Sequence, residues 1–423
     1  MSEFIDNVEQ SPRASALLEF VRRVHDGATA SEIATAYEDA IDSVRPSDVL
    51  VLEHELLEDG ISVSAVKAES EPLLATFRQP LETNDWERPE RGHPIDNMLR
   101  ENRAIESHLD ALEAAVEALS VASSPPLEAV SDLQDHIVAL EGIDRHFVRK
   151  ENELFPHLEE HWKHDRPLGV MWSIHDDLRS LRRTIEDLSE DPETNPETLS
   201  RLVARFTETA RGLLFKEEAI VFPVALRTLT DREWEQIQRE SMDLGYFEID
   251  PAFALLDEGA TDTAGESVRR SSAGTETQAS LSSGSVALGL DTGTLELDQL
   301  QLLLETIPVD VTYVDENDRV RYFNNPEERI FPRSGSIIGR TVQNCHPPES
   351  VDTVEEILEA FRSGEHDSAR FWIQNDDAFV VIEYHALRDG SGAYRGTLEV
   401  TREVSDLRRL EGEQRLIEWG TTQ

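Results

Sequence analysis

Two stretches of the sequence share one pattern and decide the fold of the middle of the chain. Residues 146–159 read HFVRKENELFPHLE, and residues 213–223 read LLFKEEAIVFP. In both stretches a lysine and a glutamate come before a phenylalanine and a proline, so the phrases KENELFP and KEEAIVFP echo one another. We interpret them as two helices of one bundle that repeat a local structure.

The apolar periodicity around these stretches predicts a four-helix bundle. Helical patterns run from about His93 to Tyr246 and are divided by short polar connections such as SSPP and EDPETNP. Short connections suit helices that lie antiparallel to their neighbours. The predicted helices cover residues 93–120, 126–161, 168–189 and 196–229, with a short extra helix after Thr230.

Composition divides the rest of the chain into further domains. Residues 13–80 predict short helices, and from about Gly259 to Gly293 the Ser, Gly, Thr and Ala content predicts a flexible linker. Beyond it the apolar period becomes strand-like, with VTYV, the turn DEND and then RVRYF, which predicts a β-hairpin. The fold class is therefore multidomain, with an all-α N-terminal region and four-helix bundle followed by an α+β domain with an antiparallel sheet. The predicted boundaries are 1–85 for an N-terminal helical domain, 86–255 for the bundle, 256–294 for the linker, 295–412 for the α+β domain and 413–423 for a tail.

Charge and cysteine content argue against several classes of function. The chain has 86 acidic and 40 basic residues, a formal charge of -46 at pH 7, and only four lysines. This composition favours a salt-rich cytoplasm, and the alternative is an ordinary acidic protein. The acidic field argues against direct binding to nucleic acid or anionic lipid. No apolar run approaches the ~20 residues that span a bilayer, and no signal-peptide pattern is present. The single Cys345 excludes an intrachain disulfide. We therefore expect a cytoplasmic protein.

Histidines cluster on the predicted bundle. Eight of the thirteen fall between residues 93 and 175. Imidazoles and carboxylates at facing positions of bundle helices are what iron or manganese requires, so we expect a metal site. The alternative is an acidic bundle with solvated histidines, an interpretation that we favour for His157, His161 and His164 near a helix end.

The four helical segments resemble a known family. GHPIDNMLRENRAIE, HFVRKENELFPHLE, VMWSIHDDLR and LLFKEEAIVFP are similar, in this order, to the four helices of the hemerythrin-like, HHE cation-binding family. The resemblance implies a non-haem di-iron centre that binds oxygen or a related small molecule, and for this chain we expect one or two iron ions. Residue by residue it implies the metal ligands His93, His146, Glu151, His175 and either Glu217 or Glu218.

On the second helix the sequence departs from that family, which places histidine and glutamate four residues apart. Here the residue four after His146 is Lys150, and Glu151 is five away, about 140° round a regular helix. A π-bulge would restore the geometry, and Pro156 already disturbs the hydrogen-bond ladder nearby.

On the fourth helix a histidine ligand is missing. Leu213 stands four residues before Glu217, and Leu214 stands four residues before Glu218. A second ion is therefore held weakly or not at all. Substitute ligands to consider are His108 and Glu153.

The C-terminal part resembles a PAS domain between Leu300 and Leu410. IPVDVTYVDENDRVRYFN, IIGR, EEILEAF and RGTLEVTREVSDLRRLE occur in the expected order. The resemblance implies a five-stranded antiparallel sheet flanked by helices, often with a ligand pocket and often a dimer. Within it, Cys345 and His346 could bind a cofactor such as haem or sense redox state, and the alternative is a packed thiol beside a proline-stiffened turn.

Three functions follow from these expectations. The order of the parts resembles a prokaryotic family that joins an N-terminal helical domain, a hemerythrin-like bundle and a PAS domain, and the composition suggests a haloarchaeal source. We expect a sensor whose iron reports oxygen, nitric oxide or redox state, and whose PAS domain acts through a protein partner or a homodimer. The alternatives are a di-iron protein that oxidises, detoxifies or handles iron, and a metal-free interaction scaffold. We favour the sensor over the enzyme and predict no catalytic residue, and the PAS ligand and the role of residues 1–85 stay open.

Overall fold

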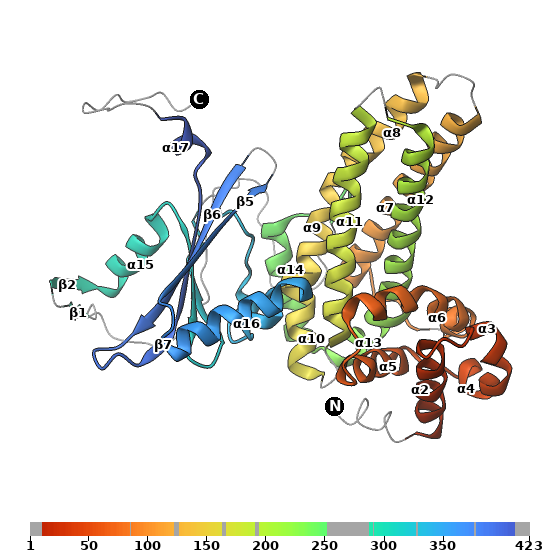
Figure 1. Cartoon of the computed structure of the whole chain (residues 1–423), viewed down its shortest axis with the longest axis horizontal. Helices are drawn as coiled ribbons and strands as arrows, with labels where there is room; N and C mark the ends of the chain where they lie inside the picture. The colour runs from red at the N-terminus through yellow and green to blue at the C-terminus, as the bar shows by residue number, and fades with distance from the viewer. Residues whose placement is uncertain are drawn as a thin grey trace, which may run out of the picture. The chain divides into compact units, whose positions relative to one another are not determined.

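A computed structural model shows the chain as two compact units, one of helices and one built around a β-sheet (Figure 1). It describes residues 11–84, 86–121, 127–162, 166–190, 194–251, 287–290, 292–326, 329–375 and 378–410. The expected fold class is confirmed, with helices throughout the first unit and an antiparallel sheet in the second.

The helical unit begins with a group of helices at one end of the bundle (Figure 1). Ser11 caps the first of them, because its hydroxyl accepts a hydrogen bond from the backbone N–H of Ala14 at 3.0 Å. The group consists of α2 (Pro12–His25), α3 (Ala30–Ile33), the 3₁₀ turn η1 (Ala34–Tyr37), α4 (Glu38–Asp42), α5 (Pro46–Glu58) and α6 (Val63–Thr83).

The four long bundle helices occupy the predicted spans. The first, third and start of the fourth are α7 (Pro94–Val121), α11 (Arg166–Glu190) and α12 (Pro196–Lys216). The second runs through α8 (Leu127–Ala139), the 3₁₀ turn η2 (Leu140–Gly142), α9 (Ile143–Arg149), the π-helical turn η3 (Lys150–Leu154) and α10 (Phe155–His161). The fourth continues through the π-helical turn η4 (Glu217–Val221) into α13 (Phe222–Thr228), and the extra helix is α14 (Asp231–Leu244).

One apolar core runs through the N-terminal helices and the bundle. Phe20 and Phe77 belong to the same buried cluster as Phe147 and Phe206 of the bundle. A buried ion pair, Lys216 Nζ to Glu53 Oε1 at 2.5 Å, also joins α12 to α5. The two predicted domains therefore pack as one body, and the boundary at residue 85 stays a sequence prediction.

The second unit holds a five-stranded antiparallel sheet of order β4-β3-β7-β6-β5. The predicted hairpin is its first pair, and Asp318 in the connecting turn has a φ of 63°. Gly396 is required where β7 passes β3, because a Cβ there would lie 2.1 Å from the Val314 carbonyl oxygen. The elements are α15 (Leu297–Thr306), β3 (Asp310–Asp315), β4 (Val320–Phe323), α16 (Pro348–Ser363), β5 (Ser368–Asn375), β6 (Ala378–Arg388), β7 (Tyr394–Glu403) and α17 (Ser405–Arg409).

A short antiparallel strand pair overlaps the end of the range predicted as linker. β1 (Ala287–Leu290) pairs with β2 (Gly293–Glu296). The sequence prediction overlooked these strands because the flanking composition is so low in large apolar residues. The rest of the predicted linker up to residue 286, and the predicted tail at 413–423, lie outside the described residues.

Candidate metal centre

Buried polar side chains meet in the middle of the bundle, around the two π-helical turns. His146 on α9, His175 on α11 and Glu217 at the start of η4 are fully buried. A proline stands two residues after the end of each π turn: Pro156 after η3 and Pro223 after η4. Because proline has no N–H to donate, the regular ladder is interrupted at that point and a wider turn can form. The π-bulge considered from the sequence is therefore present on the second helix, and a second one occupies the fourth.

His146 is held by one carboxylate and faces another. Its Nδ1 lies 3.0 Å from Glu101 Oε2, and its Nε2 lies 3.4 Å from Glu217 Oε2. Glu101 is ionised, because His146 and Arg149 outweigh the effect of burial and lower its pKa to about 2, so Nδ1 is the donor. Nε2 then faces a carboxylate oxygen, and neither of these two buried atoms has a hydrogen-bond partner. A cation between them would satisfy both.

His175 has the same arrangement on the neighbouring helix. Its Nδ1 lies 2.7 Å from Glu151 Oε1, and its ring stacks on Phe147 with centroids 4.3 Å apart. Burial lowers the pKa of His175 well below the usual range, so the ring is neutral and Nε2 carries a lone pair. Nε2 has no hydrogen-bond partner. Arg179 donates to both oxygens of Glu151 at 3.0 Å, so this carboxylate orients the histidine.

Basic side chains balance the buried carboxylates. Arg149 pairs with Glu101, and the Lys150 ammonium pairs closely with Glu217. Burial lowers the pKa of Lys150 against the opposing pull of Glu217. Burial alone would raise the pKa of Glu217, but Lys150 and His146 together lower it to about 2. With Arg179 on Glu151, three cations face three carboxylates.

The structure distinguishes the two candidate glutamates of the fourth helix. Glu217 points into the bundle, whereas the Glu218 side chain is 36% exposed and lies 3.7 Å from Arg88. Glu218 also accepts a hydrogen bond from Asn102 at 3.3 Å. Glu217 is therefore the residue available to a buried ion.

His93 lies apart from this group, at the N-terminus of α7. Its Nδ1 accepts a hydrogen bond from the backbone N–H of Ile95 at 3.1 Å, and its ring packs on Trp234 at 4.6 Å. Burial lowers the pKa of His93 to about 4. The side chain caps the helix and does not face His146 or His175.

Neither substitute ligand reaches the buried histidines. His108 forms a pair with His136, Nδ1 to Nδ1 at 2.9 Å, and its Nε2 lies 2.8 Å from Glu248 Oε2. Glu153 accepts a hydrogen bond from Ser241 at 2.5 Å, and burial raises its pKa to about 8.

Sequence reasoning missed two residues that position the histidines, Glu101 and Arg179. Arg179 stands four residues after His175, on the same helix face, which is a signal that the sequence offered. Glu101 lies within the quoted first-helix segment but 45 residues from the histidine that it holds. Only the packing of α7 against α9 reveals it.

The donor set fits one ion better than two. His146 Nε2, His175 Nε2 and Glu217 Oε2 are two imidazoles and one carboxylate, a combination that suits non-haem iron. They are not all within 4.8 Å of one another, so these side chains must move closer together when an ion binds. Lys150 and Leu213 stand where a second ion would need ligands. The three basic side chains already balance the three carboxylates, so two dications would leave the cluster strongly positive.

One of the three histidines interpreted as solvated is buried. His157 is only 7% exposed, because the first turn of α14 covers this end of α10, where Glu233 bonds to His161. The expectation for His157 is therefore wrong. The His161 side chain is 36% exposed, and His164 lies outside the described residues.

Cys345 is buried at the end of the 3₁₀ turn Val342–Cys345, and His346 is half-buried. Two arginines of the second unit pair with carboxylates, Arg388 with Asp367 at 2.8 Å and Arg333 with Glu399 at 3.6 Å. A cofactor role for Cys345 and His346 stays a prediction.

Three family models match successive parts of the chain. Residues 17–68 match a family of unknown function, residues 93–225 match the hemerythrin HHE cation binding domain, and residues 300–405 match a PAS domain. No curated protein matches. Within the described residues, no helix combines the length and the apolar character that a membrane crossing requires.

Solved structures also resemble parts of the chain. A C-terminal domain from Streptococcus mutans is 30% identical over 30% of this chain and 98% of its own, with a TM-score of 0.29. A sensory box sensor histidine kinase from Vibrio cholerae is 15% identical over 25% and 89%, with a TM-score of 0.21. A PAS domain from Colwellia psychrerythraea is 14% identical over 26% and 98%, with a TM-score of 0.21.

Proposed function

We propose that this chain, which joins a hemerythrin HHE domain to a C-terminal PAS domain, is a signalling protein that senses a small ligand or redox state through one iron ion in the bundle. One observation carries the proposal. Three buried acceptor atoms, His146 Nε2, His175 Nε2 and Glu217 Oε2, have no hydrogen-bond partner. Buried lone pairs without a donor are costly, and a cation relieves that cost.

The surrounding residues prepare the three donors. Glu101 and Glu151 hold the two Nδ1 atoms, which fixes the tautomer that leaves each Nε2 free. Phe147 stacks on His175 and, with Phe155, excludes water from the histidine. When bound, iron with two histidines and one carboxylate supplies a redox-active centre with open positions for a diatomic molecule such as oxygen or nitric oxide.

The PAS domain is the signalling part of this proposal. Its five-stranded sheet is a fold that serves sensors as a docking and ligand-binding module, and we expect it to act through a protein partner or a second copy of the chain. The charge of -46 disfavours a direct contact with nucleic acid in that role.

A metal-free interaction scaffold is the second candidate, and one observation favours it. Arg149, Lys150 and Arg179 already neutralise the three buried carboxylates. The bundle can therefore remain folded without an ion. The di-iron enzyme has no comparable support, because it needs ligands at the positions of Lys150 and Leu213.

Iron content separates the two candidates. Protein purified without oxygen is expected to hold close to one iron per chain, and His146→Ala or His175→Ala is expected to lose most of it. His25→Ala is the control, because His25 is an exposed histidine at the end of α2. Wild-type protein that neither contains iron nor takes it up would support the scaffold, and equal iron in all four proteins would refute the assigned ligands.

A further inference from the structure

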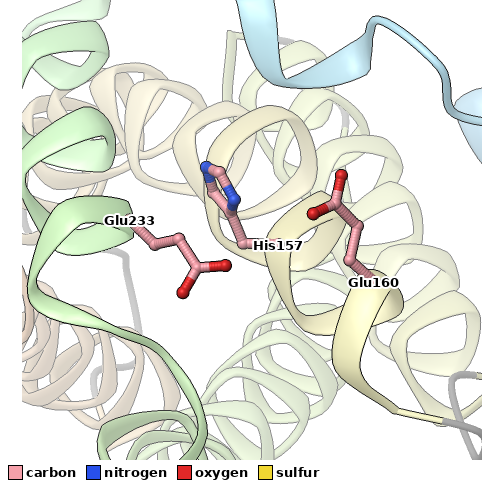
Figure 2. Close-up of side chains that lie close together, drawn as sticks. All are labelled: His157, Glu160 and Glu233. Atoms are coloured by element: carbon pink, nitrogen blue, oxygen red, sulfur yellow. The ribbon is translucent and has the colours of Figure 1, made fainter.

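A second group of histidine and glutamate side chains lies at the surface end of the bundle. His157 and Glu160 belong to α10, and Glu233 belongs to the first turn of α14. One possible ligand atom from each of the three lies within 4.8 Å of the other two. Figure 2 shows the His157 ring between the two carboxylates. Among the described residues this is the only such group of three or more.

His157 is the buried member of this group. The residue is 7% exposed, and its Nε2 has no hydrogen-bond partner. Burial lowers its pKa, so the ring is a neutral imidazole with a lone pair to offer. A buried imidazole without a partner beside two carboxylates is an incomplete site, because such groups are normally satisfied.

Glu233 and His161 complete the set of donors. Glu233 is fixed by a capping box, in which its Oε2 accepts from the Thr230 backbone N–H at 2.7 Å and the Thr230 hydroxyl at 2.6 Å. Its Oε1 lies 2.6 Å from His161 Nε2. His161 is four residues after His157 and shares its helix face, so a second imidazole lies beside the group and is joined to it through Glu233.

We infer that His157, Glu160, His161 and Glu233 form a binding site for one divalent cation of the zinc type. Two histidines four apart on a helix, with carboxylates, give the imidazole and oxygen donors that zinc takes in a four-coordinate site. The site shares no residue with the iron site proposed above. The cation links α10 to α14, because its ligands come from both helices.

This link between α10 and α14 has a structural consequence. α14 buries Trp234, Ile237 and Ser241 against the bundle, and Ser241 donates to Glu153 in the π turn η3. An ion at the start of α14 holds this helix in place and so protects the wall of the bundle that carries Glu153.

Zinc binding tests the inference with a matched pair of variants. Chelator-treated protein is titrated with zinc by calorimetry in concentrated KCl, which screens unspecific attraction to the acidic surface. Glu160→Gln removes one proposed ligand, and Glu159→Gln removes the same charge from the adjacent position. We expect one tight zinc ion per chain, an affinity at least about tenfold weaker in Glu160→Gln, and no change in Glu159→Gln.

Two further measurements keep the test decisive. Hydrogen exchange of α14 is expected to slow on addition of zinc in the wild type and not in Glu160→Gln. Because Glu160 is exposed, misfolding of this variant would not explain the difference. His146→Ala is expected to keep the tight zinc event, which separates this site from the iron site. Equal affinity in Glu160→Gln and Glu159→Gln, loss of the event in His146→Ala, or no saturable binding would overturn the inference.

Discussion

Lys150 and Leu213 occupy the two positions at which a bundle with matching ligands on its second and fourth helices would carry further metal ligands. Lys150 stands four residues after His146, and Leu213 stands four residues before Glu217. The lysine brings an ammonium group on a flexible stem to a fully buried place beside Glu217. In this position its ammonium does for Glu217 what a second metal ion would do, which is to neutralise a buried carboxylate.

Restoring both ligands is therefore expected to restore the second ion. The double variant Lys150→Glu with Leu213→His exchanges the ammonium for a carboxylate and adds an imidazole on the face of Glu217. Iron per chain should rise from about one toward two, measured on protein purified without oxygen.

The same variant should lose stability when iron is removed. An extra buried carboxylate without a cation is expected to cost about 3–5 kcal/mol of unfolding free energy, seen as a lower melting midpoint in chelator. Arg78→Glu on the exposed face of α6 is the control for charge reversal. Unchanged iron together with an unchanged midpoint would contradict the role given to Lys150.

At the scale of elements, periodicity predicted the helices and the hairpin, because burial of one face imposes the period directly on the sequence. The five-residue spacing of His146 and Glu151 before Pro156 also pointed to an irregular turn on the second helix, whereas the π turn on the fourth helix was not predicted. The carboxylate that orients His146 could not be predicted, because Glu101 reaches it from another helix. The burial of His157 was missed for a similar reason, since α14 covers it from more than 70 residues away in the sequence.

The ion pair between α5 and α12 offers a test of how the N-terminal helices are held. Lys216 and Glu53 have side chains only 4% and 10% exposed. Glu53→Gln leaves the buried ammonium without a counter-charge and should lower the unfolding free energy by about 3 kcal/mol. The helical circular dichroism signal on heating measures the effect.

A double variant provides the control for that experiment. Glu53→Leu with Lys216→Met removes both charges and keeps most of the volume, so it should recover most of the lost stability. A single variant that is as stable as the wild type would mean that water reaches the pair and that the N-terminal helices are held by apolar packing alone.

At the scale of the whole molecule, the lysines are used differently from the arginines. Three of the four lysines lie in described residues, where each lysine side chain is at most 16% exposed and makes an ion pair. The partners are Asp177 for Lys67, Glu217 for Lys150 and Glu53 for Lys216. Almost all remaining positive charge is carried by arginine, while 86 acidic residues leave the chain at -46.

This imbalance predicts how stability depends on salt. Exposed carboxylates repel one another most strongly in dilute buffer, where screening extends over roughly 10 Å or more. The buried pairs are screened far less, so added salt relieves the repulsion without weakening them to the same degree. The melting temperature of both units should therefore rise from dilute buffer into molar KCl. An uncharged osmolyte at matched osmotic strength is the control, because it favours burial without screening charge. A melting temperature that stays flat or falls in KCl would show that the surface charges are already compensated by the arginine pairs and would remove the argument for a salt-rich environment.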